Sequence, residues 1–160
     1  MVLFVCTGNT CRSPFAKAIL KKIAKEKRVD FIEAKSAGVN AFNGYPASLH
    51  AKETAKAFGV DLSNHASQWL SPEILKKADL ILAMSEDHLD RIKEIDSDSL
   101  KKTYLLSSFP KKLHRKTDSI KDPIGGKPED YQVCFQQISS SIQRIFPELV
   151  ELAQKKILLI

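Results

Sequence analysis

The sequence predicts an α/β fold with a parallel sheet that helices cover on both faces. Short continuous apolar runs at 2–5 and 80–84 are typical of strands that are buried on both sides. Segments with apolar residues at helical spacing, such as 15–23, alternate with these runs along the chain. Strands that alternate with helices favour parallel pairing through crossover helices, which places helices on both faces of the sheet.

The expected elements follow in order along one domain that spans residues 1–160. Strands are expected at 2–5, 31–34, 80–84 and 103–106. Helices are expected at 13–23, at 46–58, after Ser71, after Ser85 and from Pro128. Ser13 is the predicted N-cap of the first helix, with Pro14 as its first helical residue. A basic loop is expected at 111–121, and Pro147 is expected to kink or break the last helix.

Composition and charge narrow the class of protein. The chain has a formal net charge of +6 and 43% apolar residues, which suits a globular protein with anionic partners such as phosphorylated groups. The charge is too small to indicate nucleic acid binding, and no apolar stretch is long enough to cross a membrane. No signal peptide precedes the first strand, and the cysteine count of 3 is odd. We therefore expect a cytoplasmic protein whose cysteines are catalytic rather than disulfide-bonded.

The loop between the first strand and the first helix combines a cysteine with an arginine. Cys6 and Arg12 are separated by five residues, and Ser13 follows. This loop is expected at the ligand-binding edge of the sheet, where backbone N–H groups at a helix N-terminus form a cradle for an anion. Gly8 is expected to supply conformational freedom and Asn9 a left-handed residue. The pattern predicts a site for a phosphoryl group.

The same loop predicts a nucleophile at the bottom of that cradle. Arg12 offers a bidentate fork for two phosphoryl oxygens. The donors that bind the anion are also expected to lower the pKa of the Cys6 thiol, and Ser13 is expected to donate a hydrogen bond to the thiolate. Such a site can attack phosphorus and stabilise the group in transfer.

The segment "VCTGNTCRSP" resembles the active-site loop of the low-molecular-weight protein tyrosine phosphatases. The segments "KSAG", "DLSNHAS", "ADLILAM" and "DPIGG" resemble further landmarks of that family and occur in the same order. The resemblance implies a four-stranded parallel sheet and a two-step hydrolysis of phosphorylated proteins through a phosphocysteine. It implies that Cys6 is the nucleophile, Arg12 the phosphate clamp and Asp122 the general acid, with phosphate as product and inhibitor.

The resemblance also implies roles for the rest of the loop. It places substrate contacts at Thr7, Gly8, Asn9, Thr10, Cys11, Ser13 and Ile124. Four residues match positions that hold the family's loop in shape: Asn9, Ser13, Ser36 and His65. Cys11 is expected to trap an oxidised Cys6 as a reversible disulfide, which would make the protein redox-sensitive.

The reaction requires an acid but neither a metal nor a cofactor. A phenolate leaves from a group of pKa about 10 and a guanidine from one above about 12, so either must be protonated as its bond to phosphorus breaks. Asp122 can donate that proton and then deprotonate the attacking water. Arg12 and the backbone amides neutralise the phosphate, and the 4 histidines are scattered along the chain, so no metal site is expected.

Two positions favour phosphoarginine over phosphotyrosine as the substrate. Tyrosine-directed members commonly have an aliphatic residue where this chain has Thr10, and threonine there resembles the bacterial protein-arginine phosphatases. Tyrosine-directed members often have aromatic residues after Asp-Pro, whereas Ile124 and then two glycines follow here. A site without an aromatic wall suits a flexible guanidinium, with which Asp122 can also pair. The alternative is phosphotyrosine, because Ile124 still offers an apolar wall.

Three other classes share parts of this pattern. An arsenate reductase needs two further cysteines downstream, but "LILAMSEDHLDRIK" has none, and Cys134 is expected in the core and poorly placed to take part. A phosphocysteine carrier lacks the Arg12 clamp and a distant acid. A phosphoprotein-binding module needs neither Cys6 nor Asp122. The sequence therefore favours a phosphatase, a hydrolase of phosphoamides or phosphomonoesters in proteins.

Overall fold

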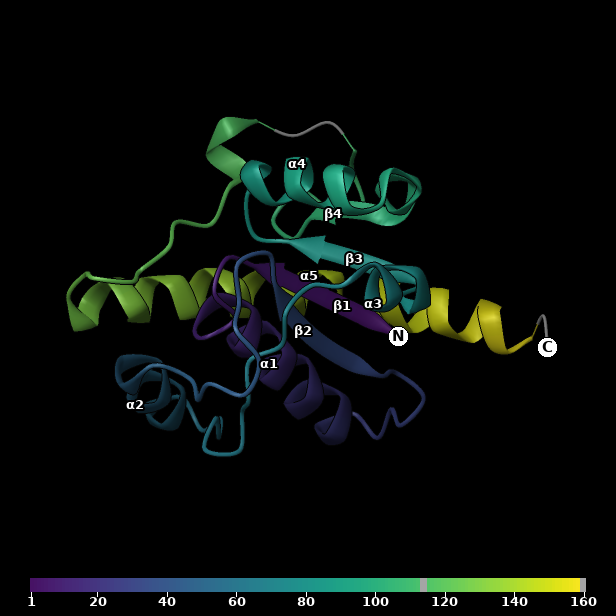
Figure 1. The fold of residues 1–160 in the computed structure, drawn as a ribbon. Coiled ribbons are helices and arrows are strands. Elements are labelled where there is room, and N and C mark those ends of the chain that lie inside the picture. The colour runs from purple at the N-terminus through teal and green to yellow at the C-terminus, as the bar shows by residue number, and fades with distance from the viewer. Residues whose placement is uncertain (113–114, 159–160) are drawn as a thin grey trace.

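The computed structural model describes residues 1–112 and 115–158, and within them four parallel strands form a sheet in the order β2-β1-β3-β4 (Figure 1). The strands are β1 (Val2–Cys6), β2 (Ala34–Gly38), β3 (Leu80–Ala83) and β4 (Thr103–Leu105). All adjacent pairs are parallel, which confirms the predicted fold class. The chain crosses from β1 to β2 on one side and later to β3 on the other. This change of direction places a ligand-binding crevice at the carboxyl end of β1.

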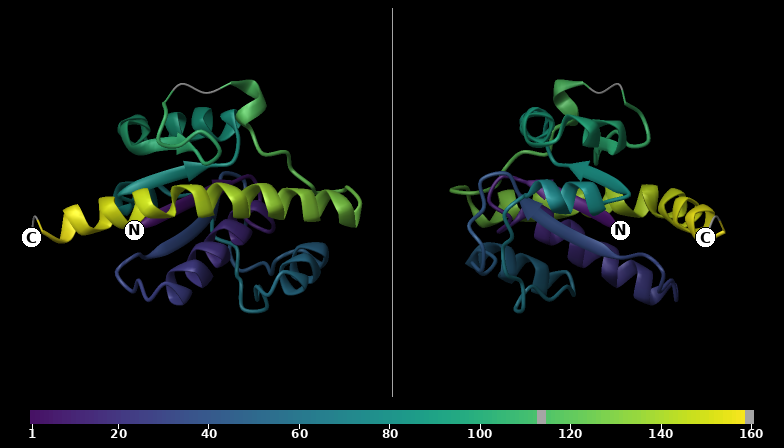
Figure 2. Two further views of the ribbon diagram at one scale, coloured as in Figure 1. Left: turned by 180° about the vertical axis from the view of Figure 1, so that it is seen from behind. Right: turned by 45° about the vertical axis from the view of Figure 1, so that its right-hand side comes forward.

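Helices cover both faces of this sheet. The α-helices in the described residues are α1 (Arg12–Glu26), α2 (Leu49–Ala57), α3 (Pro72–Lys77), α4 (Glu86–Ile95) and α5 (Pro128–Ile157), and short 3-10 helices occur at Ser97–Lys102 and Lys116–Asp118. Helices α1 and α5 pack together on one face, with α2 against α5, while α3 and α4 lie on the other. Seen from behind, α5 crosses the whole width of the molecule (Figure 2).

Alternate side chains of β1 enter two separate apolar cores. Phe4 belongs to the core under α1 and α5, where the rings of Phe15 and Phe135 meet edge to face with centroids 5.0 Å apart. Leu3 and Val5 belong to the core under α3 and α4. Because neighbouring residues of a strand face opposite ways, a strand covered on both sides must be apolar throughout, as β1 is.

The second strand lies at 34–38 rather than at the predicted 31–34. Its register pairs Cys6 with Gly38, and its small residues lie against β1 and α1. Phe31 is 37% exposed and stays outside the sheet. The strand was predicted too early because apolarity alone does not distinguish a surface contact from a strand. The other predicted elements occur with boundaries that differ by up to three residues, the largest shifts being the end of α1 at Glu26 and the start of α2 at Leu49.

The first helix begins at Arg12, with Cys11 as its N-cap, so the prediction of Ser13 as N-cap is wrong. Ser13 is buried in the first turn, where its hydroxyl contacts Cys6 instead of capping the helix. Pro14 is tolerated there because the first turn of a helix contains N–H groups that have no helical partner.

Pro147 does not break the last helix, which continues without interruption from Pro128 to Ile157. A proline removes one N–H donor and leaves the carbonyl four residues earlier, that of Gln143, without its helical partner. Gln143 and Pro147 are both exposed, so water replaces that partner and the helix persists.

Two expected features extend beyond the described residues. The basic loop at 111–121 is irregular apart from its short 3-10 helix, and its residues 113–114 lie outside the description, as do 159–160 of the domain expected over 1–160. Among the described residues, no helix has both the length and the apolar character that a membrane span requires.

Candidate active site

The sulfur of Cys6 lies at the closed end of the loop between β1 and α1. The hydroxyl oxygen of Ser13 is 2.8 Å from Sγ, and the backbone N–H of Asn9 donates to Sγ at 3.3 Å. The residue is only 2% exposed. Cys6 is also the last residue of β1, and its carbonyl oxygen accepts a hydrogen bond from the N–H of Val39. The sheet therefore fixes the backbone that carries the sulfur.

Burial raises the pKa of the Cys6 thiol, because the sulfur has lost the water that would solvate a thiolate. The Ser13 hydroxyl, the Arg12 guanidinium and the N–H groups of Ser13 and Asn9 all act in the opposite direction. The expectation of a lowered pKa is wrong for this structure, since desolvation outweighs the donors. The sequence indicated the donors correctly but could not give the depth of the sulfur in the fold.

Asn9 gives the loop its shape. Its φ of 55° is the left-handed conformation expected for it. The side-chain amide donates to Ser13 Oγ at 2.8 Å, and the amide oxygen accepts from the N–H of Gln68 at 2.8 Å. Gly8 was expected to supply this freedom, but its φ is ordinary and a Cβ there would meet only Thr10 Oγ1, at 3.7 Å. The left-handed backbone conformation therefore lies at Asn9 and not at Gly8.

A different glycine is required by close packing against the loop. A Cβ on Gly38, in the "KSAG" segment, would lie 2.5 Å from the carbonyl oxygen of Thr7 and 2.8 Å from the nitrogen of Asn9. Neither backbone atom can move without reshaping the loop. The end of β2 thus leaves room only for a residue without a side chain.

His65 supports the loop from outside, as the family resemblance implied, whereas Ser36 does not. His65 Nε2 is 2.7 Å from the carbonyl oxygen of Asn9, so Nε2 carries the hydrogen, and Nδ1 accepts from Lys17 at 3.3 Å. Burial lowers the pKa of His65. The Ser36 hydroxyl is buried and makes no hydrogen bond within the described part of the chain.

Arg12 connects the loop with the segment that follows β4. Its guanidinium is buried, and Nη1 donates to the carbonyl oxygen of Ile120 at 3.1 Å. Nη2 donates to Asp122 Oδ2 at 2.9 Å, while the other carboxylate oxygen accepts from the N–H of Ile124 at 3.2 Å. The Asp122 side chain is 41% exposed. An acidic group therefore stands at the mouth of the site, beside the cation that would bind a phosphate.

His88 is a residue of the site that sequence reasoning missed. It is 2% exposed in the first turn of α4, and its Nε2 is 2.9 Å from Thr7 Oγ1. Arg12 Nη2 donates to the same oxygen at 3.2 Å. Desolvation, with the charge of Arg12, lowers the pKa of His88 to about 3, so the ring is neutral. The only signal in the sequence was its spacing of three residues after Ser85, which is that of a capping box.

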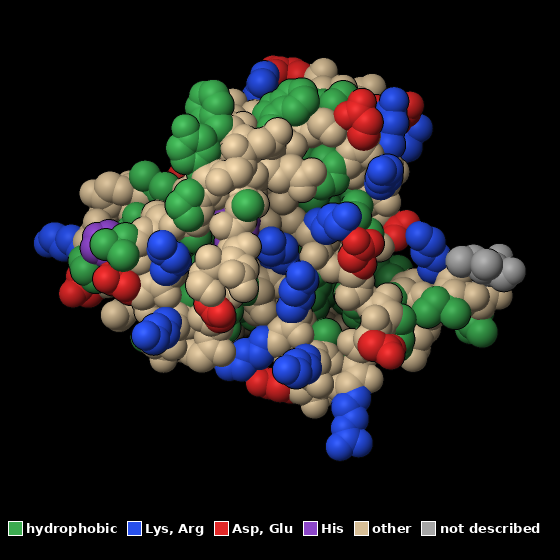
Figure 3. All heavy atoms as spheres, turned by 60° about the horizontal axis from the view of Figure 1, so that its bottom comes forward, with side chains coloured by type: hydrophobic (Ala, Val, Ile, Leu, Met, Phe, Trp, Pro, Cys, Tyr) green, Lys and Arg blue, Asp and Glu red, His purple; other side chains and the backbone are tan. Residues whose placement is uncertain are grey.

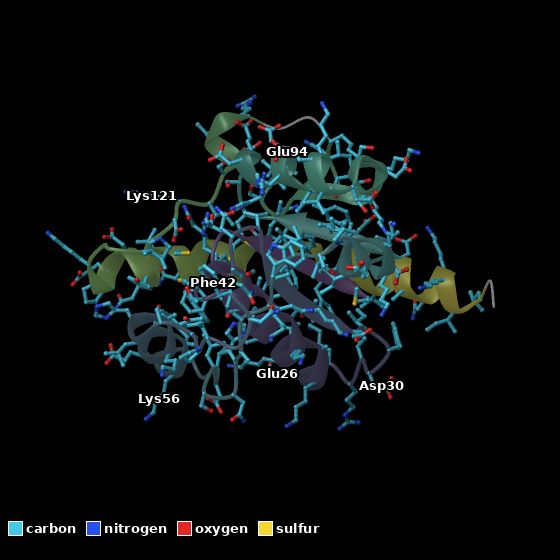
Figure 4. All side chains as sticks on the ribbon, in the orientation of Figure 1. Glu26, Asp30, Phe42, Lys56, Glu94 and Lys121 are labelled. Atoms are coloured by element: carbon cyan, nitrogen blue, oxygen red, sulfur yellow. The ribbon has the colours of Figure 1, made fainter. Side chains whose placement is uncertain are left out.

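A hollow next to the loop has an aromatic wall, which the sequence-based expectation did not include. A hollow of about 390 Å³ beside Thr10 is lined by Phe42 and Tyr45 from the loop after β2. Ile124, on the opposite segment, is 54% exposed. Figure 4 shows Phe42 and Lys121 at the end of the molecule where the strands terminate. The aromatic residues come from a loop that the comparison of Asp-Pro segments did not consider.

Cys11 has a neighbour that the sequence did not indicate. Cys11 and Cys134 are both buried in the core between α1 and α5, where Cys134 lies close enough to affect the titration of Cys11. That contact, together with burial, raises the pKa of the Cys11 thiol. No local pattern in the sequence indicates this neighbour, because it depends on the packing of α5 along α1, which brings Cys134 beside Cys11. The prediction of Cys134 as a core residue is confirmed, and all three cysteines are free.

The described residues contain no cluster of three or more His, Cys, Asp or Glu side chains that could hold a metal ion. Cations are instead spread over the surface. Lys and Arg side chains lie across much of the face formed by α1 and α2 (Figure 3), in keeping with the net charge of +6. The electrostatic features of the site are therefore those of the buried loop and its arginine, surrounded by a mildly cationic surface.

Comparison with known proteins agrees with this geometry. A family model described as low molecular weight phosphotyrosine protein phosphatase matches residues 1–156. The chain belongs to this family. A protein-arginine-phosphatase of Geobacillus stearothermophilus is 38% identical over 148 residues, which cover 92% of this chain and 95% of that protein. The family named from the loop sequence is thus confirmed.

Solved structures extend the comparison to mechanism. A low-molecular-weight protein tyrosine phosphatase from T. tengcongensis has a TM-score of 0.83 and 38% identity, covering 92% of this chain and 97% of that one. A cysteine-to-serine mutant of the YwlE arginine phosphatase, phosphorylated on its active-site serine, has a TM-score of 0.80 and 31% identity, with 96% and 93% covered. The present chain is therefore a cysteine-dependent hydrolase whose reaction passes through a phosphorylated cysteine.

Proposed function

We propose that this phosphatase hydrolyses phosphoarginine in proteins, with Cys6 as nucleophile, Arg12 as phosphate clamp and Asp122 as general acid. One arrangement carries the proposal. The Cys6 sulfur lies at the floor of a loop at a helix N-terminus, and the Arg12–Asp122 ion pair stands at the mouth of the same loop. This arrangement supports the proposal, because the three proposed groups would surround one position for a phosphoryl group.

In the first step, Cys6 Sγ forms a bond to phosphorus as the bond from phosphorus to the guanidine nitrogen breaks. Asp122 gives its proton to that nitrogen and becomes a carboxylate, so the arginine leaves as its ordinary guanidinium cation. The thiol proton passes to the entering phosphoryl dianion, a base close enough to accept it. Arg12 and the N–H groups of the loop stabilise the charge on the three equatorial oxygens.

In the second step, a water molecule attacks phosphorus and breaks its bond to Cys6, and the departing sulfur takes back the proton that the phosphoryl group had accepted from it. Asp122 takes a proton from that water, which restores the acid for the next cycle. Phosphate is the product. It also fits the same cradle as the substrate, so we propose that it inhibits competitively. Thr7, Gly8, Asn9, Thr10, Cys11 and Ser13 supply the cradle.

The substrate assignment is supported by Thr10, which lies at the rim in the hollow beside Phe42. A protein-arginine-phosphatase is among the relatives of this chain, at 38% identity. The aromatic wall is compatible with this substrate, because a guanidinium stacks well on aromatic faces. Asp122 and Ile124 line a separate hollow.

Phosphotyrosine is the second candidate, and the same wall favours it. Phe42 is 77% exposed and Tyr45 is 60% exposed, so both rings are available to a phenyl group. A solved structure of similar fold is described as a tyrosine phosphatase. It is 38% identical to this chain, as is the protein-arginine-phosphatase relative. The two substrates therefore need a direct comparison.

The test is phosphate release by reduced protein from matched phosphoarginine and phosphotyrosine peptides, with Cys6→Ser as the blank. Faster release from the arginine peptide supports the proposal, and faster release from the tyrosine peptide replaces it with the second candidate. Many turnovers per molecule would exclude a carrier, which stops after one phosphate, and a binding module, which releases none.

Two variants test the assigned roles. Thr10→Ile should shift the ratio of rates towards phosphotyrosine, while Thr10→Ser should leave that ratio near the wild-type value. Asp122→Asn should slow hydrolysis more for leaving groups of high pKa, because they depend most on protonation. Equal slowing for aryl phosphates with acidic and basic leaving groups would exclude Asp122 as the acid.

We also propose that the protein works in the cytoplasm and is controlled by oxidation there. Hydrogen peroxide would convert the Cys6 thiol to a sulfenic acid and release water, and the Cys11 thiol would then displace a second water as a disulfide forms. Peroxide treatment followed by mass-spectrometric mapping tests this pairing. A disulfide between Cys11 and Cys134 instead would refute it, since those thiols are already in contact.

A further inference from the structure

A buried histidine behind the catalytic loop has no part in the mechanism above. His88 is in the first turn of α4, and its ring lies between the start of that helix and the side chain of Thr7. The two residues are 81 positions apart in sequence. They meet because β1 and β3 are neighbours in the sheet, so the loop after each strand emerges at the same edge.

The hydrogen bonds of His88 fix which ring nitrogen carries the proton. The backbone N–H of Ser85 donates to Nδ1 at 3.1 Å, so Nδ1 presents a lone pair. In the neutral ring the hydrogen is then on Nε2. Nε2 is 2.9 Å from Thr7 Oγ1, and it must therefore be the donor to that hydroxyl. The lowered pKa of His88 keeps the ring neutral, so the same tautomer persists across the pH range of the reaction.

The hydroxyl of Thr7 receives a second donor from the other side. Arg12 Nη2 donates to Thr7 Oγ1 at 3.2 Å. A hydroxyl oxygen has two lone pairs and one hydrogen. With His88 and Arg12 occupying both lone pairs, the hydroxyl of Thr7 can act only as a donor. The same Nη2 contacts Asp122 at 2.9 Å, so this hydroxyl lies beside the groups that surround the phosphoryl position.

We propose that His88 is a positioning residue that turns the Thr7 hydroxyl into an obligatory hydrogen-bond donor to the phosphoryl group. This inference rests on the proposed function of the loop. Without His88, the Thr7 hydroxyl would be free to rotate and to accept from water. With His88, its hydrogen is directed away from both donors, and the anion gains one oriented donor besides the backbone amides and Arg12.

The test uses pairs of variants that separate this contact from a structural role. His88→Asn places an amide oxygen where Nδ1 was, which keeps the acceptor for Ser85 but removes the donor to Thr7. His88→Gln reaches the position of Nε2 and keeps that donor. Thr7→Val removes the hydroxyl at constant shape, and Thr7→Ser keeps it. Turnover of para-nitrophenyl phosphate and inhibition by inorganic phosphate are measured for each protein, together with the thermal midpoint.

We expect His88→Asn and Thr7→Val each to lower kcat/KM by roughly tenfold and to weaken phosphate inhibition, the loss expected for one hydrogen bond to a charged group. The double variant should be no slower than Thr7→Val alone, because both changes remove the same bond. Thr7→Ser and His88→Gln should recover most of the rate. Multiplied losses in the double variant, or wild-type kinetics in Thr7→Val, would overturn the proposal.

The design also separates this inference from the proposed function. If the wild-type protein hydrolyses no phosphorylated substrate, the proposed function fails. Binding is then read from the protection of Cys6 against iodoacetamide by inorganic phosphate. Protection that is roughly tenfold weaker in Thr7→Val than in Thr7→Ser still supports the oriented donor, and equal protection overturns it. Should His88→Asn fail to fold, this comparison of the two Thr7 variants decides the matter alone.

Discussion

Mild acid should destabilise this protein through His88, and replacing that residue should remove part of the effect. The pKa of His88 is lowered from 6.5 to about 3 in the folded chain, because the ring is desolvated and lies near Arg12. Between these values the unfolded chain binds a proton that the folded chain does not. The free energy of unfolding therefore falls as pH is lowered below about 6.5, and the loss is complete only near pH 3.

The size of the effect follows from the distance between the assay pH and the ordinary pKa. The assay pH of 5 is about 1.5 units below 6.5, the ordinary pKa that the side chain has in the unfolded protein, and each unit corresponds to about 1.4 kcal/mol. Folding thus loses about 2 kcal/mol of stability between pH 7 and pH 5 from this one residue. Any folded-state pKa well below 5 gives the same figure.

Urea unfolding at pH 7 and pH 5, followed by the fluorescence of the single tryptophan, measures this loss in the wild type and in His88→Asn. Carboxylates and the other histidines titrate alike in both proteins and cancel in the comparison. We expect the variant to lose about 2 kcal/mol less than the wild type between the two pH values. Losses that agree within about 0.5 kcal/mol would refute the reasoning, because His88 would then take up its proton without unfolding.

Three further changes test other parts of the structure. Gly38→Ala should lower the free energy of unfolding in urea by about 1–3 kcal/mol, since the added Cβ would overlap the loop backbone. Gly8→Ala should lower it far less, and equal losses would contradict the packing argument. Ser13→Ala should move the pH dependence of Cys6 alkylation to higher pH, because the serine hydrogen bond lowers the pKa of that thiol, and an unmoved curve would exclude the bond. Phe135→Ala should lower stability by about 3–5 kcal/mol in thermal unfolding, because the ring is buried. Val133→Ala, at a half-exposed position, should lower it little. Similar losses of stability in the two variants would show that the core tolerates removal of the ring.

The parts of the site that are local in sequence were predictable from the residues. Cys6, Arg12 and Ser13 belong to one strand-loop-helix unit, so their spacing alone indicates that they share an anion-binding turn. Asp122 is 110 residues from its ion-pair partner Arg12, and no local rule joins them. Its role was inferred from the resemblance, and the structure then places it at the mouth.

The features that were missed depend on the packing of distant elements. The contact between Thr7 and His88 exists only because β1 and β3 are adjacent, and the neighbour of Cys11 exists only because α5 lies along α1. The pKa of Cys6 depends on its burial by the complete fold, which is why the donors of the loop gave the wrong direction. The break that was one expected outcome at Pro147 does not occur, because the effect of a proline depends on whether the freed carbonyl reaches water.

The main chain of the nucleophile has a consequence for how activity is acquired. The carbonyl of Cys6 accepts from Val39 beyond the end of β2, and the carbonyl of Val5 accepts from Met84 beyond the end of β3. The chain can hold the sulfur in place only when three strands have assembled in register. Recovery of turnover after dilution from denaturant should therefore report the assembly of the sheet. The amide hydrogen of Val39 should exchange with solvent only in molecules in which this assembly has opened and activity is lost.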